Sequence, residues 1–278
     1  MTRLWNWFCD QVLYYEGSTR TAALLRISLA LLMWMRFAKN VAPFTDNSPE
    51  RLALAGSFYL STTLMLFGVY SRLSTAWAGA TALIMVFGFG PHSVEPWTHH
   101  HTTLLALSVA LCAFTPCGHS YSWDRWMAIR NGDAPPPERA PLWGMRVIGF
   151  NVSIVYLATA WDKTFWGFLA GDRMEMSFQI LYIGSEFPSM PGFEIIMMVT
   201  AVSTVALEYV LPFALWVRRW QWWAFPCGFA LHGMIFILLP VGTFTVTIFA
   251  LYLAYLDADD VHRWIDEMSG VTPATARR

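Results

Sequence analysis

Charge is the property that this sequence most lacks. Lys, Arg, Asp and Glu together make up 13% of its 278 residues, whereas about 25% is usual for a soluble domain. The formal net charge is −1 and no basic tract is present. These values exclude a protein that binds nucleic acid through a strongly basic surface.

Cysteine is also scarce. The four cysteines are widely spaced and form no CxxC pair, so the sequence lacks the motif of a zinc site or a thioredoxin-like site. Cys112 and Cys117 are five residues apart, which is off the i,i+4 face of a helix. We expect the cysteines to be small buried residues, and a redox pair is the alternative for these two.

Apolar residues, in contrast, are abundant. Hydrophobic residue types make up 56% of the chain, with fifteen tryptophans and twenty phenylalanines, and the mean hydropathy is +0.42. A membrane crossing needs about 20 apolar residues, and aromatic rings gather at membrane interfaces. The sequence therefore predicts an all-α fold, a polytopic transmembrane helical bundle with about eight spans. The predicted spans are residues 19–37, 52–70, 73–90, 101–115, 143–161, 193–217, 221–240 and 243–256.

Shorter segments flank these spans. Residues 1–18 alternate apolar and polar positions and predict an amphipathic interfacial helix. Residues 19–256 show no internal repeat and are expected to form one transmembrane domain. Residues 257–278 predict a polar cytoplasmic helix and tail. Residues 122–130 and 164–192 are expected to lie at the membrane interface.

The distribution of basic residues predicts the orientation. Eight arginines flank the spans on the side that holds both termini, and five basic residues lie on the other side. By the positive-inside rule both termini are cytoplasmic. No cleavable signal pattern precedes the first span, so we expect a multi-pass integral protein of a bacterial inner membrane, with membrane lipids as partners.

Polar residues inside apolar spans are the functional candidates, because a centrally placed charge costs about 2.5–3.5 kcal/mol there. We expect Glu208 to have a partner such as Arg146 or Arg26, either in an ion pair between helices or in a functional site. The candidates are Arg26, Arg146, Asn151, Lys163, Glu208, His232 and the cluster His99, His100 and His101.

Lys163 is the most informative of them. With Asp162 it supplies the only charge between Val147 and Ala170. It could anchor a helix end at the membrane surface, with Asp162 as its partner. A buried lysine could alternatively act as a general base. The residues alone leave both interpretations open.

The histidines allow a metal site as a weaker alternative. Three consecutive histidines point about 100° apart on a helix, so at most two would share a metal ion. A metal-dependent enzyme would need His232 in addition. His232 otherwise stands alone among apolar residues and is typical of a buried structural histidine.

Two segments resemble a known family. WTHHHTTLLALSVALCAFTPCGHSYSWDRW (Trp97–Trp126) and VYLATAWDKTFWGFLAGDRM (Val155–Met174) resemble the horizontally transferred transmembrane (HTTM) domain. The best-known member of that family is the vitamin K-dependent γ-glutamyl carboxylase. The resemblance extends over roughly residues 19–256 and includes the spans with Glu208 and His232.

The resemblance implies a function. In the carboxylase, a lysine matching Lys163 is implicated as the base toward vitamin K hydroquinone, and oxygen and carbon dioxide enter the reaction. Lys163 and His101 are thus candidate catalytic residues. The implied cofactor is a vitamin K- or menaquinol-like quinol, and no metal is expected. Candidate cofactor-binding residues are His100, His232, Trp97 and Asn151, and candidate supporting residues are Glu208, Arg146 and Asp162.

Two functions stay open. The carboxylase continues into a large lumenal portion that engages its substrate, whereas this sequence stops soon after the last predicted span. A peptide substrate would therefore need another recognition device or a partner membrane protein. The first hypothesis is a quinol-dependent enzyme that modifies a peptide or small substrate. The second is a non-enzymatic accessory subunit for maturation, export or immunity of a secreted peptide.

Overall fold

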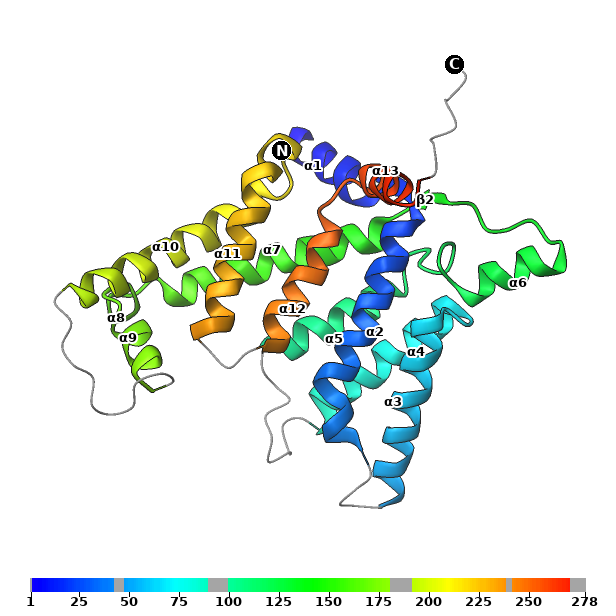
Figure 1. Cartoon of the computed structure of the whole chain (residues 1–278), viewed down its shortest axis with the longest axis horizontal. Coiled ribbons are helices and arrows are strands. Elements are labelled where there is room, and N and C mark those ends of the chain that lie inside the picture. The colour runs from blue at the N-terminus through cyan, green and yellow to red at the C-terminus, as the bar shows by residue number, and fades with distance from the viewer. Residues whose placement is uncertain (1, 43–47, 90–99, 181–191, 239–241, 271–278) are drawn as a thin grey trace. The chain divides into compact units, whose positions relative to one another are not determined.

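The computed structural model describes residues 2–42, 48–89, 100–180, 192–238 and 242–270, and most of them are α-helical (Figure 1). The chain folds as two compact units. The first combines residues 1–149 with 250–278, and the second is residues 150–249. The stretch predicted as one transmembrane domain, 19–256, is therefore divided between both units.

The first unit is built on four helices. They are α2 (Thr19–Val41), α3 (Pro49–Phe67), α4 (Ser71–Leu83), which continues as a π-helix over Ile84–Phe89, and α5 (His100–Cys112). They pack against one another in sequence order, and α2 also contacts α5 (Figure 1). Smaller elements of this unit are α1 (Thr2–Phe8) with a π-helix over Cys9–Leu13, α6 (Trp123–Asn131), a 3₁₀-helix over Tyr252–Ala254, and α13 (Ala258–Met268).

Polar residues fix where these helices begin. Ser18 caps α2 by accepting from the amide of Arg20, and Ser122 caps α6 in the same way. Asp257 accepts from the amides of Asp259 and Asp260 in the first turn of α13. Such caps satisfy amides that have no partner within the helix. The predicted polar helix over 257–268 is confirmed as α13.

The predicted all-α fold is confirmed, and one short two-stranded ribbon is added to it in the described residues. β1 (Glu16–Ser18) pairs antiparallel with β2 (Arg139–Pro141), with Ser18 opposite Arg139. The amphipathic helix predicted over residues 1–18 is therefore too long, since helical structure ends at Leu13. Gly17 is closely packed within the ribbon, because a Cβ there would lie 2.8 Å from that of Ala258.

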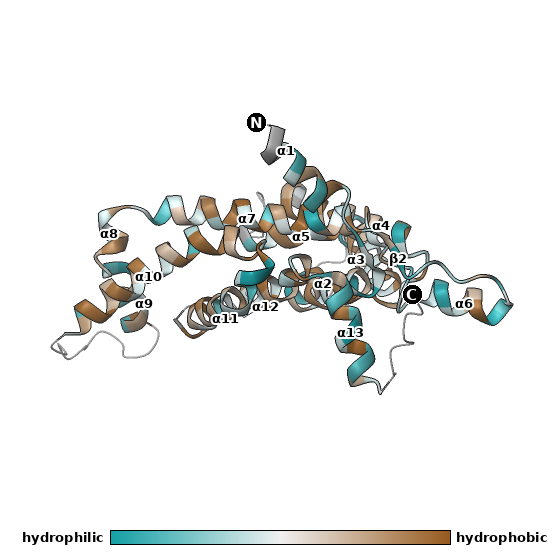
Figure 2. Cartoon of the chain, turned by 90° about the horizontal axis from the view of Figure 1, so that it is seen from above, coloured by the Kyte–Doolittle hydropathy of each residue, from teal (hydrophilic) through white to brown (hydrophobic). Residues whose placement is uncertain are grey.

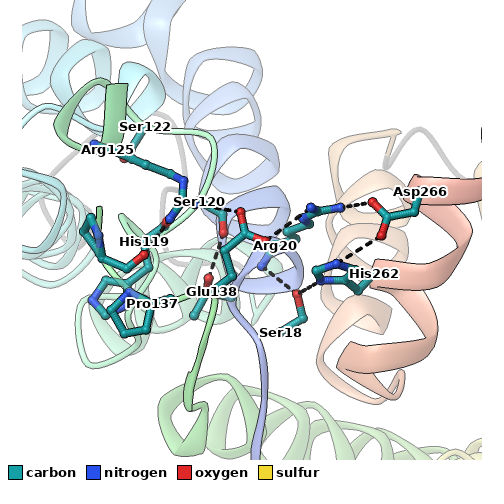
Figure 3. A network of polar contacts seen from close by, with 12 residues as sticks. Ser18, Arg20, His119, Ser120, Ser122, Arg125, Pro137, Glu138, His262 and Asp266 are labelled. Carbon is teal, nitrogen blue, oxygen red and sulfur yellow. Dashed lines mark hydrogen bonds and ion pairs between the residues drawn. The ribbon is translucent and has the colours of Figure 1, made fainter. Parts of the chain in front are cut away.

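A polar network ties α13 to the start of α2 (Figure 3). Arg20 donates to Asp266 at 2.5 Å and to Glu138 at 3.2 Å. His262 contacts Asp266 through Nε2 at 3.2 Å and Ser18 through Nδ1 at 2.8 Å. Segments from three distant parts of the sequence are thus joined in the first unit.

The second unit holds the segments with the sharpest candidates. Helix α7 (Trp143–Lys163) begins in the first unit and ends in the second. Two short helices follow, α8 (Trp166–Leu169) and α9 (Asp172–Phe178), where the sequence suggested a broken interfacial segment. The unit is completed by α10 (Phe193–Ala214), a 3₁₀-helix over Arg218–Trp220, α11 (Gln221–Leu238) and α12 (Gly242–Leu251), whose last two residues belong to the first unit.

Two helices in the described part of the chain are long and apolar enough to cross a membrane, α2 and α10. The expectation of about eight spans is therefore too high. The α5 and α12 helices have 13 and 10 residues, and 13 residues extend only about 20 Å. Helix α7 carries three charges, which lower its hydropathy. In Figure 2, α10 is largely apolar, whereas α13 mixes hydrophilic and hydrophobic residues.

Candidate functional site

Lys163 is the last residue of α7, where a cation suits the negative end of the helix dipole. Its Nζ donates to Oε1 of Glu208 on α10 at 2.5 Å. The side chain of Lys163 is 28% exposed and that of Glu208 only 4%. The ammonium group also lies 5.9 Å from the ring centroid of Phe168. An ion pair with one buried and one partly accessible member is thus the centre of the site.

The carboxylate of Glu208 can accept a further hydrogen bond. Its second oxygen, Oε2, is buried and has no hydrogen-bond partner among the described residues. A buried acceptor without a donor costs about 1–3 kcal/mol. This oxygen is therefore a place where a ligand hydroxyl would gain a bond that the protein itself does not supply.

A second polar pair lies close to the first. The hydroxyl of Tyr156 on α7 lies 2.5 Å from Nε2 of His232 on α11. His232 is 1% exposed, and its ring meets that of Phe244 edge to face at 5.3 Å. Lys163 and His232 interact electrostatically. Tyr156 precedes Lys163 by two helical turns, so both side chains are on one face of α7.

The partner of Glu208 corrects the sequence-based expectation. Glu208 pairs with Lys163 and not with Arg26 or Arg146, which both belong to the first unit. Arg146 donates to the main-chain oxygens of Ala254 and Tyr255 at 3.1 Å each. Main-chain carbonyl groups therefore bind Nη1 of Arg146, whereas the ion pair of Glu208 is with Lys163.

Two further candidates, Asp162 and Asn151, also lie in the second unit. Asp162 is exposed, and the ion pair of its neighbour Lys163 is with Glu208. Asn151 is half-buried, and its Nδ2 has no hydrogen-bond partner in the described residues. The idea that Lys163 pairs with Asp162 is therefore wrong, and a cofactor role for Asn151 stays a prediction.

The histidine cluster is only partly described. Trp97 and His99 lie outside the described residues, and His100 opens α5. His101 is half-buried in the first unit. A catalytic role for His101 beside Lys163 therefore stays a prediction. Within the described ranges no three His, Cys, Asp or Glu side chains are grouped as metal ligands.

Sequence reasoning missed Tyr156 as a site residue. The signal was available, since a tyrosine seven residues before Lys163 must share its helix face. Tyr209 was also missed: its hydroxyl lies 3.0 Å from Oγ1 of Thr164, beside the Lys163–Glu208 pair in sequence. Both tyrosines add hydroxyl groups next to a cluster that was expected to contain only charged residues and histidine.

Comparisons of this chain with protein-family models, with curated proteins and with solved structures found no match. The resemblance to the HTTM domain is thus supported by the quoted residues alone.

Proposed function

We propose that this protein is a multi-pass membrane enzyme of the HTTM type that uses a quinol-type lipid cofactor to modify a peptide or small substrate. Lys163 is its general base, and His232 and Tyr156 shape the pocket beside it. The observation that carries the proposal is the short, mostly buried contact of Lys163 with Glu208. A structural anchor at the membrane surface would not need a buried carboxylate.

The residues present fit a quinol. The unpartnered Oε2 of Glu208 can accept from a phenolic hydroxyl. Apolar side chains that suit a ring and an isoprenoid tail pack nearby on α8, α9 and α10, namely Phe168, Ala201 and Val205 with Leu169, Met174 and Tyr209. When bound, such a quinol supplies two electrons and two protons.

Proton transfer within the pair makes Lys163 a usable base. Burial removes water from the Glu208 carboxylate and in part from the Lys163 ammonium group, and this weakens the advantage of the ionised pair. A proton that passes from Nζ to Oε1 leaves an uncharged amine and an uncharged carboxylic acid. The amine can then accept a proton at Nζ from a bound hydroxyl, while Glu208 holds the first proton out of water. The Tyr156–His232 pair provides a second hydrogen-bonded route at the same face of α7.

Substitution of Lys163 by arginine tests the base directly. Arginine keeps the positive charge next to Glu208 but cannot be deprotonated in a protein. We expect Lys163→Arg to fold normally and to lose menaquinol oxidation by a factor of about 10² to 10⁴, the usual contribution of a general base. Lys39→Arg changes the other lysine of the chain, which is exposed, and should leave the rate unchanged.

Purified protein in detergent would be mixed with menaquinol under oxygen and carbon dioxide, and oxidation followed by absorbance. Equal rates for wild type and Lys163→Arg would overturn the enzymatic proposal. If Lys163→Arg also supported normal maturation of a secreted peptide in cells, the accessory-subunit hypothesis would take its place.

A further inference from the structure

A cavity of about 260 Å³ lies in the first unit, apart from the residues used above. Its lining comes from the turn between α3 and α4, from the loop before α6 and from α6 itself, and includes Tyr70, Arg72, Leu73, His119 and Asp124. Arg72, His119 and Asp124 are charged or ionisable, whereas Tyr70 and Leu73 are large, mainly apolar and exposed. Such a lining suits a ligand with a polar head and an apolar part.

The turn that carries Arg72 is held in place by Asp124. The carboxylate of Asp124 accepts from the amides of Tyr70 and Ser71 and from the hydroxyl of Ser71, each at 2.8 Å. Tyr70 has a left-handed backbone with φ +45°, which is uncommon for a residue with a side chain. These three bonds occupy both carboxylate oxygens and fix the turn. Asp124 therefore shapes the cavity rather than offering a site for a cation.

Positive charge dominates around the cavity. Arg72 is exposed; its Nε donates to the carbonyl of Ala113 at 3.4 Å, and its two Nη groups have no partner among the described residues. Arg26 is fully buried, and its Nη1 lies 3.5 Å from the hydroxyl of Ser71 in the cavity wall. The ion pairs in the described part of the chain include neither arginine. Two arginines thus face the single carboxylate of Asp124, and this balance favours an anionic ligand.

His119 adds a ring nitrogen that suits a ligand with phosphate and hydroxyl groups. Its Nδ1 lies 3.1 Å from the carbonyl oxygen of Pro137 (Figure 3). A carbonyl oxygen can only accept, so Nδ1 carries a hydrogen and Nε2 is the nitrogen left for a ligand. On a neutral ring Nε2 accepts a bond from a hydroxyl, and on a protonated ring it donates to a phosphate oxygen. Both forms of the ring can therefore bind such a ligand.

The neighbouring elements favour a position of the cavity at the membrane surface. The loop before α6 is tied through Ser120 to Thr19, the first residue of α2, by a hydrogen bond of 2.7 Å. Since α2 is long and apolar enough to cross a membrane, its first residue belongs at the level of the lipid headgroups. On α6, Trp123 and Trp126 are exposed, and Arg130 lies 5.1 Å from the ring centroid of Trp126. Exposed tryptophan is typical of the membrane interface.

We propose that this cavity binds an anionic phospholipid with a phosphoglycerol headgroup. The two Nη groups of Arg72 bind the phosphate, Nε2 of His119 bonds a glycerol hydroxyl, and the acyl chains follow the exposed Tyr70 and Leu73 into the bilayer. Basic cavities at the cytoplasmic membrane surface are suited to anionic lipid headgroups. Phosphatidylethanolamine fits less well, because its ammonium group would meet the positive charge of Arg26 and Arg72. The proposal rests on the membrane insertion of the proposed function but not on its chemistry.

Lipid competition followed by native mass spectrometry tests this site. The full chain, purified in detergent, is mixed with equal amounts of phosphatidylglycerol and phosphatidylethanolamine that carry the same acyl chains. We expect phosphatidylglycerol to stay bound in preference. Arg72→Gln should weaken its binding about tenfold, because a charge-assisted contact is lost. Arg72→Lys keeps the charge but not the forked geometry, and should bind with intermediate affinity.

Arg130→Gln is the matched control, since Arg130 is an exposed arginine of α6 that does not line the cavity. It should bind lipid as wild type does. Equal losses in Arg72→Gln and Arg130→Gln would overturn the proposal, because surface charge alone would then hold the lipid. Equal binding of the two lipids would also overturn it. So would displacement of phosphatidylglycerol by an equal concentration of glycerol phosphate, which lacks acyl chains.

Two further measurements keep the result unambiguous. Arg72 is exposed, so Arg72→Gln should keep the melting temperature of wild type, and its loss of lipid would not reflect unfolding. The same variant should oxidise menaquinol at the wild-type rate, because Arg72 lies in the first unit and Lys163 in the second. A protein that binds phosphatidylglycerol but oxidises no menaquinol would support this site while the enzymatic proposal failed.

Discussion

At the scale of single residues, the Lys163–Glu208 pair combines unequal exposure with a short contact. Glu208 is buried on α10, and Lys163 reaches it from the partly accessible end of α7. Water can solvate the lysine in part but not the carboxylate. Loss of the lysine should therefore cost more free energy of unfolding than loss of the carboxylate.

This asymmetry predicts the cost of breaking the pair. Lys163→Met leaves a buried charge without compensation and should destabilise the protein by about 3 kcal/mol. Lys163→Met/Glu208→Met removes both charges and should regain most of that loss. Thermal unfolding of wild type, of the single variants Lys163→Met and Glu208→Met, and of the double variant in one detergent measures the difference. If the double variant were as unstable as the sum of the two single variants, the two side chains would not be coupled.

At the scale of elements, two glycines close helices in the same left-handed conformation but in different surroundings. Gly68 ends α3 with φ +68° and Gly132 ends α6 with φ +80°. A Cβ on Gly68 would lie 2.2 Å from Nη1 of Arg26, whereas a Cβ on Gly132 would meet nothing within 4 Å. A comparison of the two positions therefore separates the cost of backbone strain from the cost of a steric clash.

Alanine at each position gives a matched test. Gly132→Ala should cost about 1–2 kcal/mol, the usual penalty for a left-handed residue with a side chain. Gly68→Ala carries the same strain and also displaces Arg26, so it should cost at least twice as much. Melting temperatures of both variants, measured side by side, give the comparison. Equal losses would mean that Arg26 moves aside without cost.

At the scale of the molecule, the polar network of Figure 3 joins the C-terminal helix to the rest of the first unit. The hydrogen bond from Arg20 holds the pKa of Asp266 below its ordinary value of 3.8. A carboxylate with a lowered pKa in the folded state stabilises the fold above the unfolded pKa. That contribution is lost as the pH falls through the lowered value.

Acidification should therefore loosen α13 before the rest of the unit. We expect its amides to exchange faster below about pH 3.8, after correction for intrinsic rates. Hydrogen-exchange mass spectrometry at pH 5 and at lower pH would follow this. Asp266→Asn should loosen α13 at both pH values, while Glu267→Gln, at the exposed neighbouring position, should match wild type. If the amides of α13 exchanged no faster at low pH than those elsewhere in the chain, the contacts of Asp266 would not hold α13 in place.

Membrane insertion is a further prediction at the scale of the whole molecule. Helices α2 and α10 meet the length and hydropathy that a crossing requires. The assignment of sides that was made from the sequence for eight spans predicts cytoplasmic termini. Reporter fusions to the C-terminus should give active green fluorescent protein and inactive alkaline phosphatase. The opposite pattern would show that the basic residues do not set the orientation here.

Local patterns in the sequence determined a large part of this description. Apolar composition predicted helices, the polar stretch after residue 256 predicted α13, and isolated polar residues in apolar runs marked Lys163, Glu208 and His232. These inferences succeed because helix formation and the cost of burying charge depend on nearby residues. The number of spans was overestimated because hydropathy alone does not show where a helix breaks, as α5 does at Cys112.

The pairings were decided by tertiary structure alone. The sequence showed an isolated carboxylate but could not show that Lys163 reaches it and that Arg146 binds carbonyl groups instead. Nor could it show that Arg26 lies against Cys117. Partners 45 and 91 residues apart meet only through the rotation and packing of whole helices, which no local pattern encodes.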